Sequence, residues 1–206
     1  GPNMGSDQVW VYDDKWLMGT EFYRQNKWLW TYPESQPSGP RSARGFGWFC
    51  WKPFIILDAM MRIDAGDIIL YTDADTFPIA DFSVLFDECA RIGGQMMFNA
   101  LGCRNWEWIK RDCYIVMGQD VPKYHNGQHA VGRFMLFQKG HWRPIQFLLE
   151  WLTYCLNPLA QSFEPSVLGF PEVVGPADCA SRIFKQHRTE QAIMTLLCLK
   201  YGLKLY

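Results

Sequence analysis

The amino-acid sequence predicts an α/β protein in which helices cover both faces of a mostly parallel central sheet, a three-layer α/β/α arrangement. One reason is that strand-like and helix-like segments alternate along the 206 residues, which are enough for one sizeable domain. A second reason is the run 68–71, which is apolar throughout and is followed closely by Asp73 and Asp75. A continuously apolar strand is typical of a parallel sheet that is buried on both faces.

The first elements are read from the N-terminal part of the chain. Residues 9–12 and 28–32 are short apolar runs, and we expect the first two strands there. The stretch 33–44 is rich in proline, serine and glycine and is expected to be a loop. Apolar residues at helical spacing then predict a helix over 48–63 that packs on the sheet and leads into the strand at 68–71.

The middle of the chain continues this alternation. Ser83 can cap a helix that runs to about Arg91, and Gly93-Gly94 would end it. A further strand is expected at 95–99, and residues 105–117 are expected to be partly helical.

Two helices and one strand are expected in the C-terminal third. Residues 129–138 alternate and predict a strand at the far side of the sheet. An amphipathic helix is expected over 142–156, stopped by Asn157-Pro158, and another helix over 190–201. The stretch 159–183 between them is long for a loop without secondary structure, which favours a lid or a binding loop.

The two ends of the sequence suggest a single domain over 7–206. Residues 1–6 look like an expression scar and are excluded from the fold. Residues 202–206 read as the start of a new strand, so we expect a domain excised from a longer, multidomain chain.

Composition narrows the class of protein. The net charge of −1 gives no basic excess that would indicate a nucleic-acid partner. No apolar run reaches the roughly 18 residues that a membrane span requires. The seven cysteines are scattered and form no Cys-x-x-Cys pair, which favours a reducing, cytoplasmic compartment over a disulfide framework.

Asp73 and Asp75 are the strongest chemical signal in the sequence. Residues i and i+2 of an extended chain point the same way, so both carboxylates would face one side at the end of a strand. Two carboxylates there predict a site for Mn²⁺ or Mg²⁺. Ligands of α/β sheets bind beyond the carboxyl ends of strands, which fits a functional site at this position.

Three functions are compatible with this pattern. Nucleotide-sugar transfer uses Asp-x-Asp with a cation that neutralises the diphosphate. Phosphoryl transfer of the haloacid-dehalogenase type begins with Asp-x-Asp-x-Thr, which residues 73–76 match only in part, and that motif belongs on a first strand with a later acidic pair. A non-catalytic carbohydrate-binding module would use the abundant aromatic residues. The order of segments favours the first function.

Four segments carry a resemblance to a known family. Residues 45–57 resemble a Gly-x-x-x-Trp-Lys-Pro-x-x-Ile segment of short bacterial and viral sugar transferases, and residues 66–75 resemble their Gly-Asp-x-x-x-Tyr-x-Asp-x-Asp strand. Residues 108–112 are similar to a Thr-Lys-Arg-Asp segment, and residues 187–191 to a His-x-x-Asp-Gln segment. On these motifs the chain resembles a GT-A fold glycosyltransferase of the Asp-x-Asp type. It is also similar to the N-terminal domain of chlorovirus proteins that glycosylate the major capsid protein.

The resemblance implies an activity and its partners. It implies transfer of a sugar from a nucleotide-sugar donor, in particular a UDP-sugar, to a glycan or glycoprotein acceptor, with Mn²⁺ or Mg²⁺ as cofactor. For a viral protein the compartment would be the host cytoplasm. The transferred sugar, which a viral likeness would allow to be a deoxyhexose, and the stereochemical outcome stay open.

The resemblance also implies roles for individual residues. Asp75 would bind the metal, Asp73 would bind the metal or the ribose, and His187 would reach the diphosphate or the metal. Glu190, which replaces the usual aspartate, would orient donor or acceptor, and Glu190, Asp73 and Asp75 form the expected catalytic set. The residues expected to contact the donor are Tyr12, Arg44, Lys52, Asp73, His187 and Gln191.

Two further sets of candidates come from the residue types. Trp106 and Trp108 could stack on the acceptor sugar, as Tyr12 could on a uracil ring. An inverting transfer requires a carboxylate base beside the acceptor hydroxyl. The carboxylates that remain open for this role are Asp112, Asp120, Asp178 and Glu190.

Overall fold

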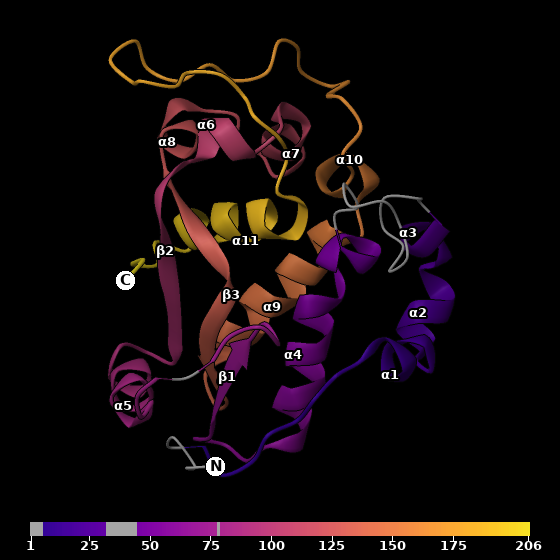
Figure 1. The fold of residues 1–206 in the computed structure, drawn as a ribbon, viewed down its shortest axis with the longest axis vertical. Helices are drawn as coiled ribbons and strands as arrows, with labels where there is room; N and C mark the ends of the chain where they lie inside the picture. Colours follow the sequence, from indigo (N-terminus) through magenta and orange to yellow (C-terminus); the bar gives the residue numbers. More distant parts are fainter. Residues whose placement is uncertain (1–5, 32–44, 78) are drawn as a thin grey trace.

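The computed structural model describes residues 6–31, 45–77 and 79–206 of the chain (Figure 1). Within these residues, three strands form an antiparallel sheet in the order β1-β3-β2. The strands are β1 (Ile68–Thr72), β2 (Gln95–Arg104) and β3 (Gln128–Gln138). The longer helices are α4 (Trp51–Arg62), α5 (Ser83–Arg91), α9 (Trp142–Cys155) and α11 (Thr189–Lys200). The shorter ones are α1 (Asp14–Met18), α2 (Glu21–Gln25), α3 (Lys27–Thr31), η2 (Phe46–Phe49), α6 (Asn105–Trp108), α7 (Arg111–Val116), α8 (Pro122–His125) and α10 (Pro158–Gln161).

The predicted mostly parallel sheet of a GT-A fold is wrong. β1 and β2 are both antiparallel to β3, so they run in the same direction as each other, as a strand–helix–strand unit through α5 should. However, β3 lies between them, so neither of them has the other as its neighbour. The strand predicted at 129–138 exists, but it is central rather than at the far side of the sheet. β1 is consequently an edge strand of this sheet and is mostly half-buried.

The N-terminal strands were also predicted wrongly. Residues 9–12 form no strand, and most of 28–32 belongs to α3, whose Leu29 and Trp30 are buried. Trp30 stacks on Phe46 at 4.8 Å between ring centroids, so tertiary packing of aromatic rings replaces the expected strand pairing. The loop predicted at 33–44 lies outside the described residues.

The helices and the other strands follow the predicted pattern closely. The expected helices at 48–63, 83–91, 142–156 and 190–201 correspond to α4, α5, α9 and α11, and the partly helical stretch 105–117 contains α6 and α7. The last residues do add to the sheet. Leu205 forms a parallel bridge with Met97, and the Tyr206 amide donates to the Met97 carbonyl at 3.0 Å.

The two faces of the sheet bury different clusters. In β3, Phe134 and Leu136 pack on the side covered by α5, while Met135 and Phe137 pack in the larger core. Helices α4, α9 and α11 lie on that second side of the sheet (Figure 1). This alternation places residues 133, 135 and 137 on the same face, because side chains alternate along a strand. The face with α11 is therefore the one that carries Arg133.

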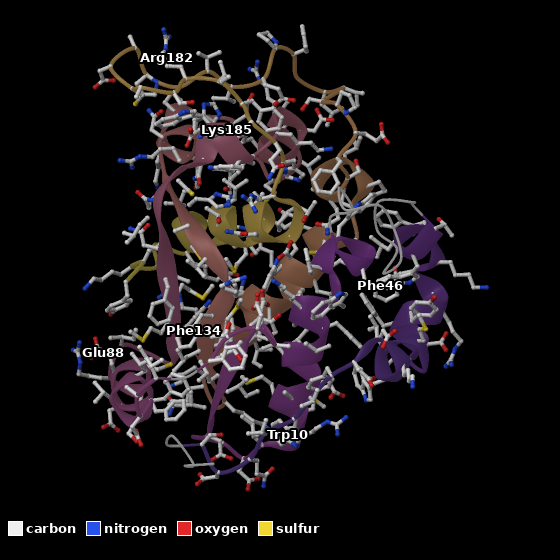
Figure 2. All side chains as sticks on the ribbon, viewed as in Figure 1. Trp10, Phe46, Glu88, Phe134, Arg182 and Lys185 are labelled. Atoms are coloured by element: carbon white, nitrogen blue, oxygen red, sulfur yellow. The ribbon has the colours of Figure 1, made fainter. Side chains whose placement is uncertain are left out.

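A long segment without regular structure, residues 162–188, arches over α6 and α7, and we call it the strap (Figure 1). Figure 2 shows Arg182 on this arch and Lys185 below it, over α6. The strap is anchored by Asp112, which is fully buried. The Asp112 carboxylate accepts backbone N–H groups from three consecutive strap residues, 167–169, at 2.7–3.3 Å.

In the described part of the chain, no helix is both long enough and apolar enough to cross a bilayer.

Candidate functional site

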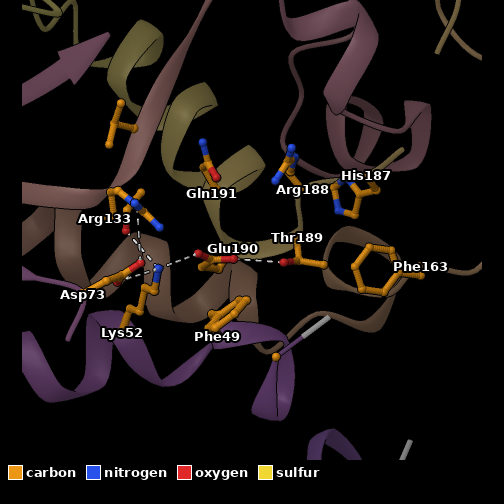
Figure 3. A pocket seen from close by; sticks show the side chains of 13 residues that line it. Phe49, Lys52, Asp73, Arg133, Phe163, His187, Arg188, Thr189, Glu190 and Gln191 are labelled. Atoms are coloured by element: carbon orange, nitrogen blue, oxygen red, sulfur yellow. Dashed lines mark hydrogen bonds and ion pairs between the residues drawn. The ribbon is translucent and has the colours of Figure 1, made fainter. Parts of the chain in front are cut away.

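A cavity of about 470 Å³ lies beside the end of β1 (Figure 3). It is bounded by the turn and helix start at 45–52, by Asp73, by residues 131–133 of β3 and by residues 187–191 at the start of α11. Phe163 from the strap completes its lining. Small-molecule sites commonly have volumes of roughly 300–1,000 Å³, so the cavity has a size suited to a ligand.

Three of the four motif-bearing segments of the sequence line this cavity, and the fourth contacts its lining. Segments 45–57, 66–75 and 187–191 each contribute lining residues. Segment 108–112 supports the lining from behind: the Lys110 backbone N–H donates to Nδ1 of His187 at 3.3 Å. Segments far apart in the sequence are thus brought together at one place.

Lys52 is at the centre of the charged groups. Its Nζ donates to the Gly132 carbonyl at 2.9 Å and pairs with Asp73 at 3.3 Å and with Glu190 at 3.2 Å (Figure 3). Only 4% of Lys52 is exposed, so its ammonium group is enclosed by these three acceptors. An ammonium group has three donors, and all three are engaged. Lys52 therefore fixes the two carboxylates and is not placed as a free phosphate ligand.

Glu190 lines the cavity although only 3% of the residue is exposed. Its Oε2 accepts from the Thr189 hydroxyl at 2.9 Å. Burial raises the pKa of Glu190, while Lys52 acts in the opposite direction by favouring the ionised form. A carboxylate whose pKa is raised is a better proton acceptor than an ordinary glutamate, which suits Glu190 to act as a base beside the cavity.

The other carboxylates considered as a base are engaged elsewhere. Asp112 holds the strap, as described above. Asp120 pairs with Arg111 at 3.1 Å and with His125 at 2.9 Å. Asp178 is exposed on the strap and does not line the cavity. Of the four candidates, the structure places Glu190 alone at the cavity.

Asp73 and Asp75 share a cationic partner, Arg133. The Asp73 backbone N–H donates to the Arg133 carbonyl at 3.0 Å, which extends the pairing of β1 with β3 by one residue. The Arg133 guanidinium pairs with Asp75 at 3.2 Å and with Asp73 at 3.9 Å. Asp73 Oδ1 also accepts from the Tyr71 hydroxyl at 2.7 Å. The two aspartates therefore lie close enough to share one positive charge.

Asp73 and Asp75 can hold a divalent cation only if a bound ligand supplies further donor atoms. Among residues 6–31, 45–77 and 79–206, no three histidine, cysteine, aspartate or glutamate side chains gather to hold a metal. Mg²⁺ and chemically similar ions are commonly held by one or two protein carboxylates together with substrate phosphates and water. Asp73 and Asp75 match that donor set, with the remaining positions left to phosphate oxygens and water.

His187 does not fit the expected role of metal ligand. Its Nδ1 accepts the Lys110 backbone N–H, and its Nε2 lies 2.7 Å from the Ala160 carbonyl, to which that nitrogen must donate. Both ring nitrogens are thus used inside the protein. Burial lowers the pKa of His187 to about 3, so the ring is neutral and its role is to position the start of α11.

Several other expected contacts lie away from the cavity or point elsewhere. Tyr12 donates to Asp58 at 2.7 Å and does not line the cavity. Trp106 is buried, with its Nε1 donating to the Ser181 carbonyl at 3.2 Å, so its ring is not available to stack on an acceptor. Gln191 does line the cavity, but its amide donates to the Ala130 carbonyl at 2.7 Å. Arg44 lies outside the described residues.

Trp108 has a different partner from the expected sugar. The guanidinium of Arg188 lies 4.4 Å from its ring centroid and the ammonium of Lys185 lies 5.2 Å from it. A cation over an indole face is attracted by the ring quadrupole. Trp108 therefore holds Arg188, which is exposed and lines the cavity.

Eight of the described lining residues are not among the predicted site residues, and four of these eight have charged or aromatic side chains: Phe49, Arg133, Phe163 and Arg188. Arg188 is adjacent to His187 within a recognised segment, which is a signal for it. For Arg133 the only signal in the sequence is the alternation of residues along β3. This alternation places Arg133 on one face of the sheet but does not show which strand pairs with it.

The turn that forms one wall of the cavity is strained. Trp48 and Phe49 have φ values of 50° and 60°, which non-glycine residues rarely adopt. Gly47 has φ 56°, and a Cβ there would lie 1.9 Å from the Trp30 ring, so a glycine is required. The Trp48 carbonyl accepts from Gln161 at 2.9 Å and from Thr189 at 3.2 Å, and these two hydrogen bonds hold the turn. Strained backbone at a cavity is characteristic of functional sites.

No protein-family model, no curated protein and no solved structure matches this chain.

The free energy of unfolding is expected to fall as the pH is lowered from about 6.5 toward 3. Burial lowers the pKa of both His129 and His187 to about 3, whereas an unfolded histidine has a pKa of about 6.5. The unfolded state therefore binds more protons in this window, which costs about 2 kcal/mol per histidine at pH 5. The raised pKa of Glu190 acts in the opposite sense, since the folded state holds that proton more tightly.

Urea unfolding at pH 7.5 and pH 5 measures this loss. His129→Gln should make the stability less dependent on pH, while the same change at the exposed His141 should leave the dependence as in the parent protein. Equal stability of the parent protein at the two pH values would contradict the prediction.

Proposed function

We propose that this chain is a glycosyltransferase that binds a nucleotide-sugar, in particular a UDP-sugar, in the cavity beside Asp73. In this proposal the sugar passes to a glycan or glycoprotein acceptor. The observation that carries the proposal is that three separate sugar-transferase-like segments line one charged cavity, while the fourth contacts the lining residues His187 and Arg188. The proposal rests on the site and not on the topology of the sheet, because function is decided by sites that different folds can carry.

The charges of the cavity suit a diphosphate. Arg133 and Arg188 both line it and are both exposed, so their guanidinium groups can turn toward a ligand. Guanidinium groups recognise phosphate oxygens through paired, charge-assisted hydrogen bonds. Phe49 and Phe163 add two aromatic rings, which offer apolar faces to a nucleobase or a sugar.

The carboxylates have separate roles in the proposed reaction. A divalent cation held by Asp73 and Asp75 together with the diphosphate would supply charge neutralisation of the leaving group. Glu190 accepts the proton of the acceptor hydroxyl at its carboxylate as that oxygen bonds to the sugar carbon, while the bond from this carbon to the diphosphate oxygen breaks and the nucleoside diphosphate leaves. Lys52 fixes Glu190 and Asp73 relative to each other, since it pairs with both. Preorganised charges of this kind stabilise a transition state without the cost of reorienting groups.

A thermal-shift titration with UDP and Mn²⁺ tests this function. A ligand that binds only the folded state at about 100 times its Kd stabilises it by roughly 2.7 kcal/mol, and for a chain of this size that raises Tm by roughly 5–10 °C. Asp75→Ala should abolish the Mn²⁺-dependent part of the shift without loss of the fold, because the side chain of Asp75 is 68% exposed. Asp178→Ala, at an exposed aspartate of the strap, should retain the shift.

Two results would contradict the proposal. Release of inorganic phosphate from a sugar phosphate, with no effect of UDP, would favour phosphatase chemistry at Asp73. Binding of glycans that is independent of both metal and nucleotide would instead favour a carbohydrate-binding module.

A further inference from the structure

Arg133 is placed against both aspartates by the register of the sheet. Thr72 pairs with Phe134, so the next residue of the chain, Asp73, comes opposite Arg133. Residues that share a face of neighbouring strands interact directly. The guanidinium group reaches Asp75 at 3.2 Å as well as Asp73 at 3.9 Å. One positive charge therefore bridges the two carboxylates that match the donor set of a divalent cation.

We propose that Arg133 and a divalent cation compete for Asp73 and Asp75. In the ligand-free protein the arginine pairs with Asp75 and with the Oδ2 oxygen of Asp73, and the cation binds when the guanidinium group leaves these oxygens. The side chain of Arg133 is 57% exposed and also lines the cavity, so it is free to move from the aspartates to a ligand. A cation and a guanidinium group cannot both sit against these oxygens at low cost, because like charges repel at such distances.

The competition has a consequence for nucleotide binding, which rests on the proposed function. A diphosphate offers Arg133 new anionic partners in the cavity and so releases the aspartates for the cation. The nucleotide should then raise the affinity for the cation, and the cation should raise the affinity for the nucleotide by the same factor. The function of Arg133 is thereby to make entry of the cation depend on the presence of the donor.

Binding of Mn²⁺ alone tests the competition, and it requires no activity. Free Mn²⁺ can be measured by electron paramagnetic resonance during titration of the protein. Arg133→Met should bind Mn²⁺ about tenfold more tightly than the parent protein, since removing the guanidinium frees Asp75 and the Oδ2 oxygen of Asp73 and removes a repelling charge, while Lys52 and Tyr71 keep their contacts with Oδ1 of Asp73. The double variant Arg133→Met/Asp75→Ala should lose this gain.

Arg62→Met is the matched control. Arg62 pairs with Asp58 at 2.8 Å, and its side chain is 50% exposed, which is close to the exposure of Arg133. Its removal should leave the Mn²⁺ affinity unchanged, because it does not alter the pairing of Arg133 with Asp73 and Asp75.

The outcomes separate this inference from the proposed function. Mn²⁺ binding by Arg133→Met that is no tighter than in the parent protein, or no binding of Mn²⁺ to either protein, would overturn the competition. Tighter binding of Mn²⁺ in Arg133→Met with no effect of UDP in any variant would support the competition and would remove the nucleotide-sugar function.

Discussion

Replacing Lys52 with methionine is expected to lower the free energy of unfolding by about 3–5 kcal/mol at pH 7.5, because it leaves a buried carboxylate without its partner. Glu190 is 3% exposed, and Lys52 is its ion-pair partner at 3.2 Å. The variant also leaves the Gly132 carbonyl without the Lys52 donor. Urea unfolding of both proteins measures the difference.

The double variant Lys52→Met/Glu190→Gln separates the charge from the packing. Glutamine has the shape of glutamate without its charge, so the double variant should recover much of the stability that Lys52→Met loses. The loss in Lys52→Met should also be smaller at pH 5 than at pH 7.5. The reason is that burial already raises the pKa of Glu190, and loss of the lysine raises it further, so the carboxyl group is protonated sooner as the pH falls. A double variant as unstable as Lys52→Met would contradict this account.

Asp112→Ala is expected to lower the free energy of unfolding by about 2–4 kcal/mol, because it removes a buried, charged acceptor that holds three backbone N–H groups of the strap. The Asp112 carboxylate accepts the backbone N–H groups of residues 167–169, and no part of Asp112 is exposed. Its loss weakens the attachment of the strap to α7, where Arg111 still contacts Glu172 and Pro171. Cleavage of the strap by a protease should therefore become faster, in addition to the change seen by urea unfolding.

Two further variants serve as comparisons for Asp112→Ala. Asp112→Asn keeps one acceptor oxygen and should lose less stability than Asp112→Ala. Asp178→Ala changes an exposed aspartate in the same strap and should leave both stability and proteolysis unchanged. A strap that resists protease equally in Asp112→Ala and in the parent protein would show that other contacts hold it.

The sequence located most of the elements but not their arrangement. Helical periodicity over 83–91 and 142–156 was sufficient, because one amphipathic face is buried wherever the helix packs. The order of the strands depends on contacts between distant residues, which periodicity does not report. The alternation of strands and helices predicted a parallel strand next to β1. In the structure the antiparallel strand β3 lies between β1 and β2 instead. In the same way, residues 27–31 form a helix rather than the predicted strand because Trp30 is buried among aromatic rings from other parts of the chain.

The candidate site was predictable where a local motif carried it. Lys52, Asp73 and Glu190 stood in recognisable segments, and they meet at the cavity. Arg133 was not found, because its position opposite Asp73 follows from the register of β1 and β3. The neutral state of His187 was not readable either, since it results from burial and from the Ala160 carbonyl, 27 positions away in the chain.

The left-handed turn at Trp48 and Phe49 has a consequence for the order of folding. Its strained backbone is held by hydrogen bonds from Gln161 and Thr189, which are 113 and 141 positions away in the chain. Contacts between residues so far apart form late, after the local helices, because closing such long loops has a large entropic cost. The turn therefore reaches its native shape only when the C-terminal third has docked. A nascent chain that has not yet supplied these donors has no finished cavity, so ligand binding reports completed folding of the whole described chain.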